Sequence, residues 1–326
     1  MLLVGHGSES ENNPYESALD CGACGGNSGI FNARSMAQMA NKSEVRRRLR
    51  EQGLDIPTDV YFVAALHNTT TDEITILDRE LIPPAHLIYL DRLHKGLKAA
   101  SRMCAQERMA TLVPSDFGVP PDANASSRLA RRNASDWSQA RPEWGLSRNA
   151  YFVIGRRQIT QRAELAGRAF LNSYDWRVDP KRRLLESILT GPLVVGQWIN
   201  MEHYFSTVDN ERYGSGNKAY HNVAGRFGVM TGNLSDLRTG LPAQTVLKEG
   251  HPYHEPLRLI TLIEAPFEHA RSAIEGVVTI KRLVQNGWIR MLVLDPETLA
   301  VHLYDHGAWQ KVDLPDAFVL EPTGSD

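Results

Sequence analysis

Short apolar runs alternate with longer segments of helical periodicity along this chain. Residues 1–5 and 59–66 are apolar on both faces and predict buried strands. Residues 83–110 carry leucines at helical spacing and predict a long helix. Shorter helices are expected at 32–41 and 43–52. Strands that alternate with helices in this way indicate an α/β fold.

The second half of the chain shows both patterns again. A short strand is expected at 151–155 and an amphipathic helix at 192–208. In the last third, strands are expected at 257–263, 288–294 and 301–304, with a helix near 268–286. These elements predict a C-terminal α+β layer that follows the first α/β unit.

Pattern and charge together divide the chain into three expected regions. These are part of an α/β domain at 1–113, a basic linker and helical region at 114–190, and an α+β region at 191–326. The 326 residues carry a net charge of only −2, so no overall field attracts nucleic acid, and no nucleic-acid partner is expected. Between residues 126 and 183, however, 13 Lys and Arg residues outnumber 5 Asp and Glu residues. This window is either a solvated face balanced by acidic neighbours or a surface that attracts anions or a partner.

Cysteine usage and hydropathy bear on the compartment. The chain has three cysteines: Cys21, Cys24 and Cys104. A disulfide framework needs a larger, even number, so this count favours a reducing compartment. No apolar run approaches the ~20 residues that a membrane helix needs. We therefore expect membrane association only through a partner or a surface patch.

The strongest candidate chemistry lies in the glycine-rich stretch after the first apolar run. His6 follows that run, and Cys21 and Cys24 lie in the segment DCGACGG at 20–26. Histidine and cysteine are zinc ligands, and glycines allow the chain to turn sharply around a metal. The residues alone leave three interpretations open: a zinc site, a redox dithiol, or small buried residues in a tight loop. Two glycines directly after the cysteines disfavour the dithiol, whose first cysteine usually begins a helix.

Other candidate sites are weaker. The chain has no P-loop, no G-x-S-x-G nucleophile elbow and no dinucleotide fingerprint between a strand and a helix. His67 ends the second predicted strand, so we expect it to share with His6 the sheet edge at which α/β proteins bind ligands. His67 and His203 are otherwise lone histidines, which are more often hydrogen-bonded turn or core residues than ligands.

Several strings along the chain together resemble one family. They include GHGS at 5–8, NNP at 12–14, SALDCGACGG at 17–26, HNTTTD at 67–72, RPEWGL at 141–146, STVDN at 206–210 and HEPLRL at 254–259. This combination is similar to the DabA family, the zinc-binding subunit of an inorganic carbon pump, over essentially the whole chain.

The resemblance implies a zinc site like that of β-type carbonic anhydrases. Its ligands are a Cys-x-Asp-x-Arg segment plus a histidine and a cysteine fifteen residues apart, which fall on His6 and Cys21; Cys24 is then a neighbour. This chain has no Cys-x-Asp-x-Arg segment, and family members are much longer. The implied α/β fold is a β-carbonic-anhydrase-like mixed sheet with flanking helices plus the C-terminal α+β layer. It is expected to be truncated at the N-terminus and to carry half of the zinc ligands.

The resemblance also implies an activity, the hydration of carbon dioxide to bicarbonate. Zinc (Zn²⁺) lowers the pKa of its bound water toward ~7, so the reaction can run at neutral pH. The implied partner is a DabB-type membrane subunit related to proton-pumping NADH dehydrogenase subunits. The implied location is peripheral, on the cytoplasmic face of the inner membrane, and the chain alone is expected to be inactive.

Two alternatives to this reading belong to other classes of function. One is a non-catalytic domain that docks on the membrane subunit, for example through the basic window. The other is an unrelated zinc hydrolase that uses His6, Cys21 and Cys24 as its own ligands.

Overall fold

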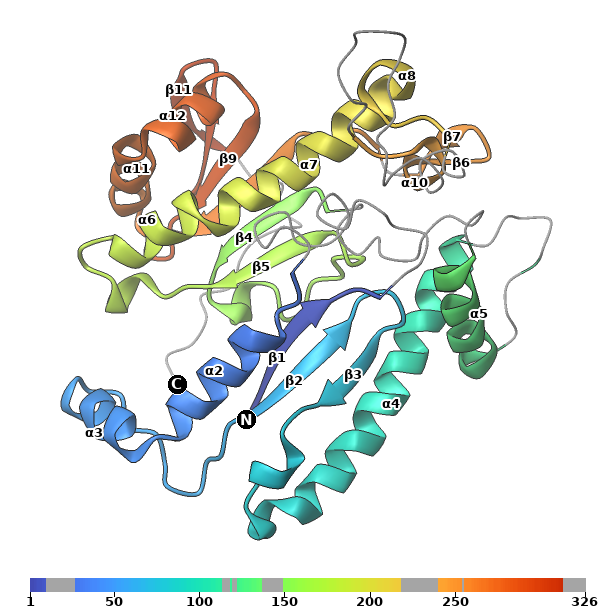
Figure 1. Cartoon of the computed structure of the whole chain (residues 1–326). Helices are drawn as coiled ribbons and strands as arrows, with labels where there is room; N and C mark the ends of the chain where they lie inside the picture. The colour runs from blue at the N-terminus through green and yellow to red at the C-terminus, as the bar shows by residue number, and fades with distance from the viewer. Residues whose placement is uncertain are drawn as a thin grey trace, which may run out of the picture. The chain divides into compact units, whose positions relative to one another are not determined.

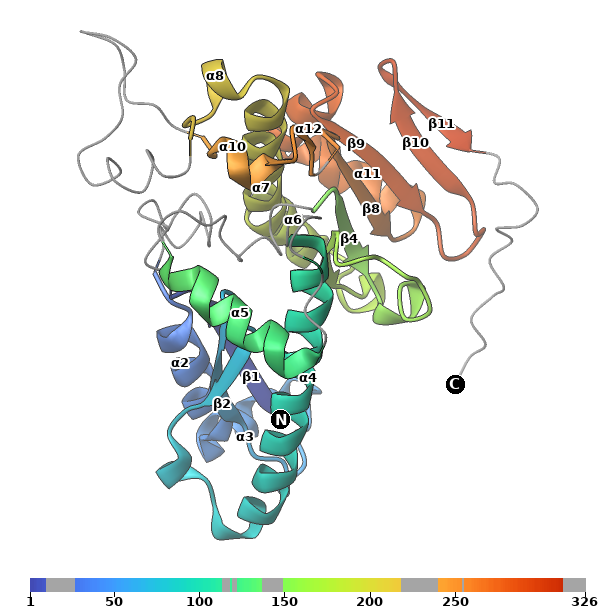
Figure 2. The same ribbon diagram turned by 90° about the vertical axis from the view of Figure 1, so that its right-hand side faces the viewer.

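The computed structural model describes residues 1–9, 27–112, 118, 122–136, 149–217, 240–253 and 255–312. The chain divides into two compact units, each built from two stretches of sequence. Unit 1 comprises Met1–Trp144 and Asp209–Tyr253, and unit 2 comprises Gly145–Val208 and His254–Asp326. Both units mix helices and strands, which confirms the predicted α/β class (Figures 1 and 2). The three regions expected from pattern and charge stay a prediction.

Unit 1 contains a three-stranded mixed sheet in the order β1-β2-β3. β1 (Leu2–Gly7) runs parallel to β2 (Val63–Asn68), which pairs antiparallel with β3 (Glu73–Ile76). The second predicted strand is confirmed from Val63 onward, because a turn at Pro57 and Val60 occupies the residues before it. β1 is less buried than predicted, since it lies at the edge of this sheet and Val4 is 46% exposed.

Helices cover both faces of this sheet. α2 (Ile30–Asn41) packs against Ala64 of β2, whereas α4 (Pro84–Leu112) packs in the cluster that contains Val63. Neighbouring residues of β2 therefore serve opposite faces, as a pleated strand requires. The remaining elements near this sheet are α3 (Ser43–Glu51), the 3₁₀ turn η2 (Arg79–Leu81) and α5 (Ala123–Ser135), which packs against α4.

The second stretch of unit 1 contributes short elements. These are α8 (Asn210–Tyr213), α10 (Ala243–Val246) and a small hairpin of β6 (Leu247–Lys248) and β7 (His251–Pro252). The hairpin is joined to the end of α4, because Lys248 Nζ donates to the Thr111 carbonyl oxygen at 2.9 Å and Tyr253 Oη to Thr111 Oγ1 at 3.0 Å.

Unit 2 is built on a six-stranded mixed sheet in the order β11-β10-β9-β8-β4-β5. Four strands are parallel: β4 (Tyr151–Gly155), β5 (Ala169–Ser173), β8 (Leu259–Glu264) and β9 (Ile289–Leu294). β10 (Val301–Asp305) and β11 (Ala308–Val312) extend it in antiparallel fashion. The strands predicted at 151–155, 257–263, 288–294 and 301–304 are thus confirmed to within two residues, whereas β5 and β11 were not predicted.

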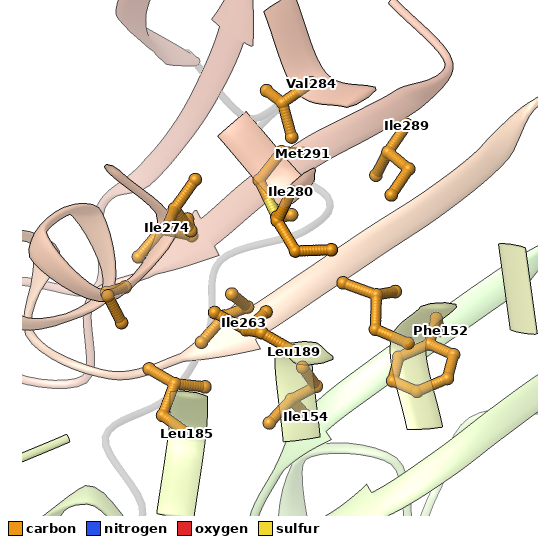
Figure 3. Packing of buried hydrophobic residues seen from close by; sticks show 14 of the residues in the cluster. Phe152, Ile154, Leu185, Leu189, Ile263, Ile274, Ile280, Val284, Ile289 and Met291 are labelled. Carbon is orange, nitrogen blue, oxygen red and sulfur yellow. The ribbon is translucent and has the colours of Figure 1, made fainter. Parts of the chain in front are cut away.

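Helices of unit 2 pack on this sheet around one hydrophobic core. They are η4 (Arg157–Ile159), η5 (Trp176–Val178), α6 (Arg183–Thr190), α7 (Pro192–Val208), α11 (Phe267–Gly276) and α12 (Val278–Gln285). Leu185 and Leu189 of α6 lie one turn apart and meet Ile154 of β4 and Ile263 of β8 (Figure 3). The helix predicted near 268–286 is two helices, because the backbone at Val277 is extended (φ −99°, ψ 99°).

Candidate zinc half-site and its surroundings

His6 lies near the carboxyl end of β1 and directly opposite His67 of β2. The parallel register pairs the two residues, so their side chains leave the same face of the sheet. This confirms that the two histidines meet at the carboxyl edge of neighbouring strands, where α/β sheets bind ligands. The pairing joins residues that are far apart in the sequence, and this is why the sequence gives no direct sign of it.

The chain returns to His6 at the start of α2. The Gly29 amide donates to the His6 carbonyl oxygen at 2.7 Å. A Cβ atom at Gly5 would lie 2.3 Å from the Gly29 carbonyl oxygen, so both positions need a residue without a side chain for the backbones to approach this closely. Gly5 and Gly29 therefore allow the first turn of α2 to lie against the backbone of His6, the candidate ligand.

The His6 ring is suited to binding a metal. The residue keeps contact with solvent, yet burial by the surrounding atoms lowers its pKa, and the neighbouring His67 lowers it further. A histidine whose pKa is lowered is neutral at pH 7, which is the form that binds a metal ion. Within the described part of the chain, no residue forms a hydrogen bond with the His6 imidazole.

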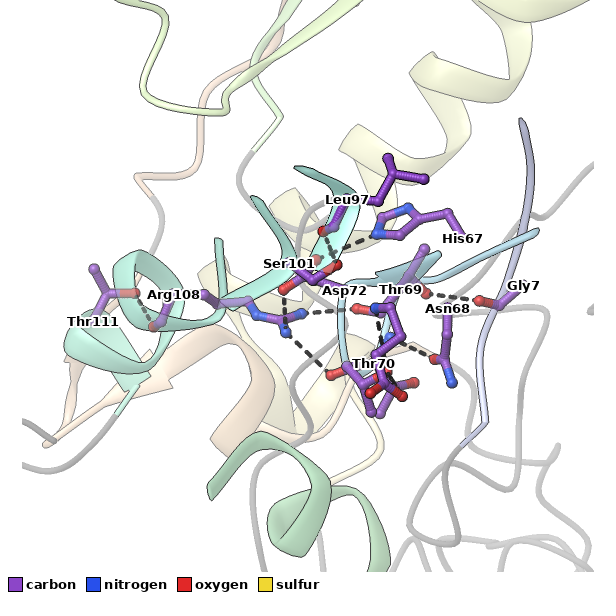
Figure 4. Close-up of polar contacts among 12 residues, drawn as sticks. Gly7, His67, Asn68, Thr69, Thr70, Asp72, Leu97, Ser101, Arg108 and Thr111 are labelled. Atoms are coloured by element: carbon purple, nitrogen blue, oxygen red, sulfur yellow. Dashed lines mark hydrogen bonds and ion pairs between the residues drawn. The ribbon is translucent and has the colours of Figure 1, made fainter. Parts of the chain in front are cut away.

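A polar network holds the turn that follows His67 (Figure 4). His67 Nε2 lies 3.4 Å from Asp72 Oδ1, and Asp72 Oδ2 lies 2.5 Å from Arg108 Nη2 of α4. Arg108 also donates to the carbonyl oxygens of Thr69 (2.7 Å) and Thr70 (3.1 Å). Asp72 has a left-handed backbone (φ 62°), which is uncommon outside glycine. Arg108 therefore fixes both the backbone of the turn and the carboxylate beside His67.

Arg108 was not among the predicted site residues, because it lies within α4, far along the chain from the turn. A carboxylate next to a histidine is the usual partner that orients a metal-binding imidazole. Asp72 and Arg108 are therefore placed to orient His67 beside His6.

The remaining candidate residues are two cysteines of the glycine-rich stretch, the lone histidine His203 and the third cysteine, Cys104. Cys21 and Cys24 lie outside the described residues. Among the described residues, no three His, Cys, Asp or Glu side chains are grouped as a metal site would need. His203 is a core residue, as expected for a lone histidine: it is buried, and its Nδ1 lies 2.8 Å from the Ile199 carbonyl oxygen. Cys104 is a free thiol.

No helix in the described ranges is both long enough and apolar enough to cross a bilayer.

The chain is similar to proteins described as probable inorganic carbon transporter subunits. The family described as "Probable inorganic carbon transporter subunit DabA" matches residues 1–289. A relative with this description from Thiobacillus denitrificans is 67% identical over 313 residues, which are 95% of this chain and 30% of the relative. The relative from Nitrosomonas eutropha is 62% identical over 95% of this chain and 30% of its own. The relative from Aquifex aeolicus is 53% identical over 96% of this chain and 31% of its own.

The chain thus spans about 30% of the length of the relatives it matches. No solved structure matches it. Because the family match covers most of its residues, the chain belongs to the DabA family, described as probable inorganic carbon transporter subunits.

Proposed function

We propose that this chain supplies half of the ligands of a zinc site, His6 and Cys21, in a protein that takes up inorganic carbon. The observation that supports this is the position of His6. His6 lies near the carboxyl end of β1, opposite His67, and its carbonyl oxygen accepts from Gly29 at the start of α2. Burial and the neighbouring His67 lower the pKa of its imidazole, which favours the neutral form that binds a metal. The remaining ligands would come from a part of the protein that this chain does not contain.

Zinc bound there would supply a water of lowered pKa, which is what a carbonic-anhydrase-like hydration of carbon dioxide to bicarbonate needs at neutral pH. The residues of this chain serve that site in two ways. His6 presents a neutral nitrogen, and Asp72 with Arg108 holds the neighbouring His67 in place. The proposal includes a DabB-type membrane subunit as partner and a peripheral position on the cytoplasmic face of the membrane.

The zinc content of the purified chain tests this proposal. It is measured for the chain alone and after mixing with the separately expressed remainder of the Thiobacillus denitrificans relative. About one zinc per complex in the mixture and almost none in the chain alone is the expected result. Tight binding by the chain alone would contradict the split site and favour a hydrolase that uses His6, Cys21 and Cys24.

Point variants in the mixture test the individual ligands. His6→Ala and Cys21→Ala should each abolish zinc binding, whereas Cys104→Ala, which changes the exposed free thiol on α4, should not. Cys24→Ala should have a milder effect than Cys21→Ala. Equal losses for Cys21→Ala and Cys24→Ala would show that the wrong thiol has been assigned. In a full-length relative, the changes matching His6→Ala and Cys21→Ala should also abolish growth at air levels of carbon dioxide.

A further inference from the structure

A basic groove lies in unit 1 between β3, α4 and α5. Its volume is ≈ 850 Å³, which falls in the range of ligand-binding clefts. Its walls are one side of α4 and one side of α5, two helices that pack against each other (Figure 2). None of its basic residues belongs to the zinc half-site proposed above.

Five basic side chains line this groove. They are Arg79 of η2, Lys98 and Arg102 of α4, and Arg128 and Arg131 of α5. The only acidic residue among the described lining residues is Glu73, and it pairs with Arg131. The groove is therefore strongly positive.

Three of these cations have no acidic partner in the described part of the chain: Arg79, Lys98 and Arg128. Lys98 and Arg102 are four residues apart, and Arg128 and Arg131 are three apart, so each pair lies on one side of its helix. Like charges at these spacings repel and cost stability. A bound anion would relieve this repulsion. Two of the five cations belong to the basic window at 126–183, so part of that window lies in a concave surface rather than on a flat solvated face.

The floor of the groove is the outer strand of the sheet. All four residues of β3 line the groove. Because successive side chains of a strand point to opposite faces of the sheet, a groove on one face alone would be lined by only every second residue. The groove therefore reaches the open edge of β3. Within the described residues β3 pairs only with β2, on its other edge. An open strand edge can bind an extended peptide by adding it to the sheet as a further strand.

We propose that this groove docks an acidic, extended peptide segment of a partner protein along the edge of β3. Backbone hydrogen bonds to β3 would hold the segment, and its carboxylates would pair with cations from both walls, Lys98 on α4 and Arg128 on α5. A small anion is a poorer fit, because the cations are spread over three elements. A flat membrane surface is also a poorer fit, because these cations line a concavity.

Fluorescence anisotropy with the full chain tests the proposal. The probe is a labelled peptide of alternating Glu and Val, measured at low salt and at ~0.15 M salt. The K98E/R128E variant should weaken binding at least about tenfold. The matched control is K95E/R132E, which reverses two exposed cations on the same helices that do not line the groove. It should bind within about twofold of the unchanged chain. Amide exchange at Ile74 and Ile76, whose N–H groups alternate with those that face β2, should slow when the peptide is bound.

Several results would overturn the proposal. Equal weakening by both double variants would show general charge attraction, and equal binding of a Lys-Val peptide would show that charge is irrelevant. Competition by inorganic phosphate as strong as by unlabelled peptide would identify a small-anion site instead. Binding of phosphatidylglycerol vesicles but not of the peptide, lost in K98E/R128E, would identify a membrane contact. Neither Lys98 nor Arg128 belongs to the proposed zinc half-site, so the zinc content of the mixture should be the same for these variants, and this test is independent of the proposed function.

Discussion

At the scale of single residues, close packing around His6 depends on glycine. Gly5 and Gly29 allow β1 and the start of α2 to approach within hydrogen-bonding distance, and this places His6 against α2. A side chain at either position would collide with backbone atoms, which cannot move aside as a flexible side chain can.

Gly5→Ala should therefore lower the free energy of unfolding by about 1–3 kcal/mol or more, because its Cβ would overlap the Gly29 carbonyl. It should also reduce zinc binding in the mixture described above. Gly96→Ala is the control: a Cβ there meets nothing within 4 Å, and alanine favours the helix by up to ~1 kcal/mol. Urea unfolding measures both variants, and equal stability for the two would show that the approach is not tight.

Glu202 on α7 is a second residue whose environment has a measurable consequence. Burial raises its pKa to about 7. Between pH 4.5 and about 7, the Glu202 carboxyl is therefore protonated in the folded state and ionised in the unfolded state. The folded state binds more protons in this range, so the free energy of unfolding falls as the pH rises through it. Glu202→Gln removes that loss, so it should raise the free energy of unfolding by ~1–3 kcal/mol at pH 8 and change little at pH 4. Chemical unfolding at the two pH values checks this, with the exposed Glu275→Gln as control. A pH-independent effect of Glu202→Gln would contradict the assignment.

At the scale of elements, the turn between β2 and β3 is held from outside. Arg108 of α4 binds two of its carbonyl oxygens and its carboxylate, Asp72. Both partners of the ion pair are mostly buried, with side chains 13% and 16% exposed. A helix thus fixes the geometry of a turn that the local sequence alone does not determine.

Arg108→Gln should destabilise the chain by about 2–4 kcal/mol, because it leaves Asp72 without its counter-charge in a mostly buried position. The amides of Thr71 and Asp72 should exchange faster with solvent. Arg131→Gln breaks a more exposed pair with Glu73 and should cost less than ~1 kcal/mol. Urea unfolding and amide hydrogen exchange distinguish the two. If Arg108→Gln cost no more than Arg131→Gln, the turn would not depend on α4.

At the scale of the whole molecule, the segment 209–253 interrupts unit 2 in the sequence. The large core of unit 2 comes entirely from its own two stretches. Asn200 of α7 donates to the Leu257 carbonyl oxygen at 3.0 Å, so the chain re-enters unit 2 close to α7.

Unit 2 should therefore fold without that segment. From Asn200 to the end of α7 at Val208 is about 12 Å at 1.5 Å per residue, which a Gly/Ser linker of roughly eight residues can span. A protein that joins 145–208 to 254–326 through this linker should show one cooperative thermal transition and a near-ultraviolet dichroism signal. A gradual, non-cooperative transition would show that unit 2 depends on the rest of the chain.

The α/β class and most element positions could be predicted from the amino-acid sequence, because apolar periodicity is a local property. The candidate ligands His6 and Cys21 came from the family resemblance, and their assignment stays a prediction. The apolar pattern placed 151–155 and 192–208 at the bounds observed. Packing between distant segments set what local patterns do not encode. Parallel pairing across a long intervening segment set His6 opposite His67, and α4 brought Arg108 to Asp72. The same packing gathered cations from η2, α4 and α5 into one groove, because contacts between distant segments depend on how elements pack and not on their own sequences.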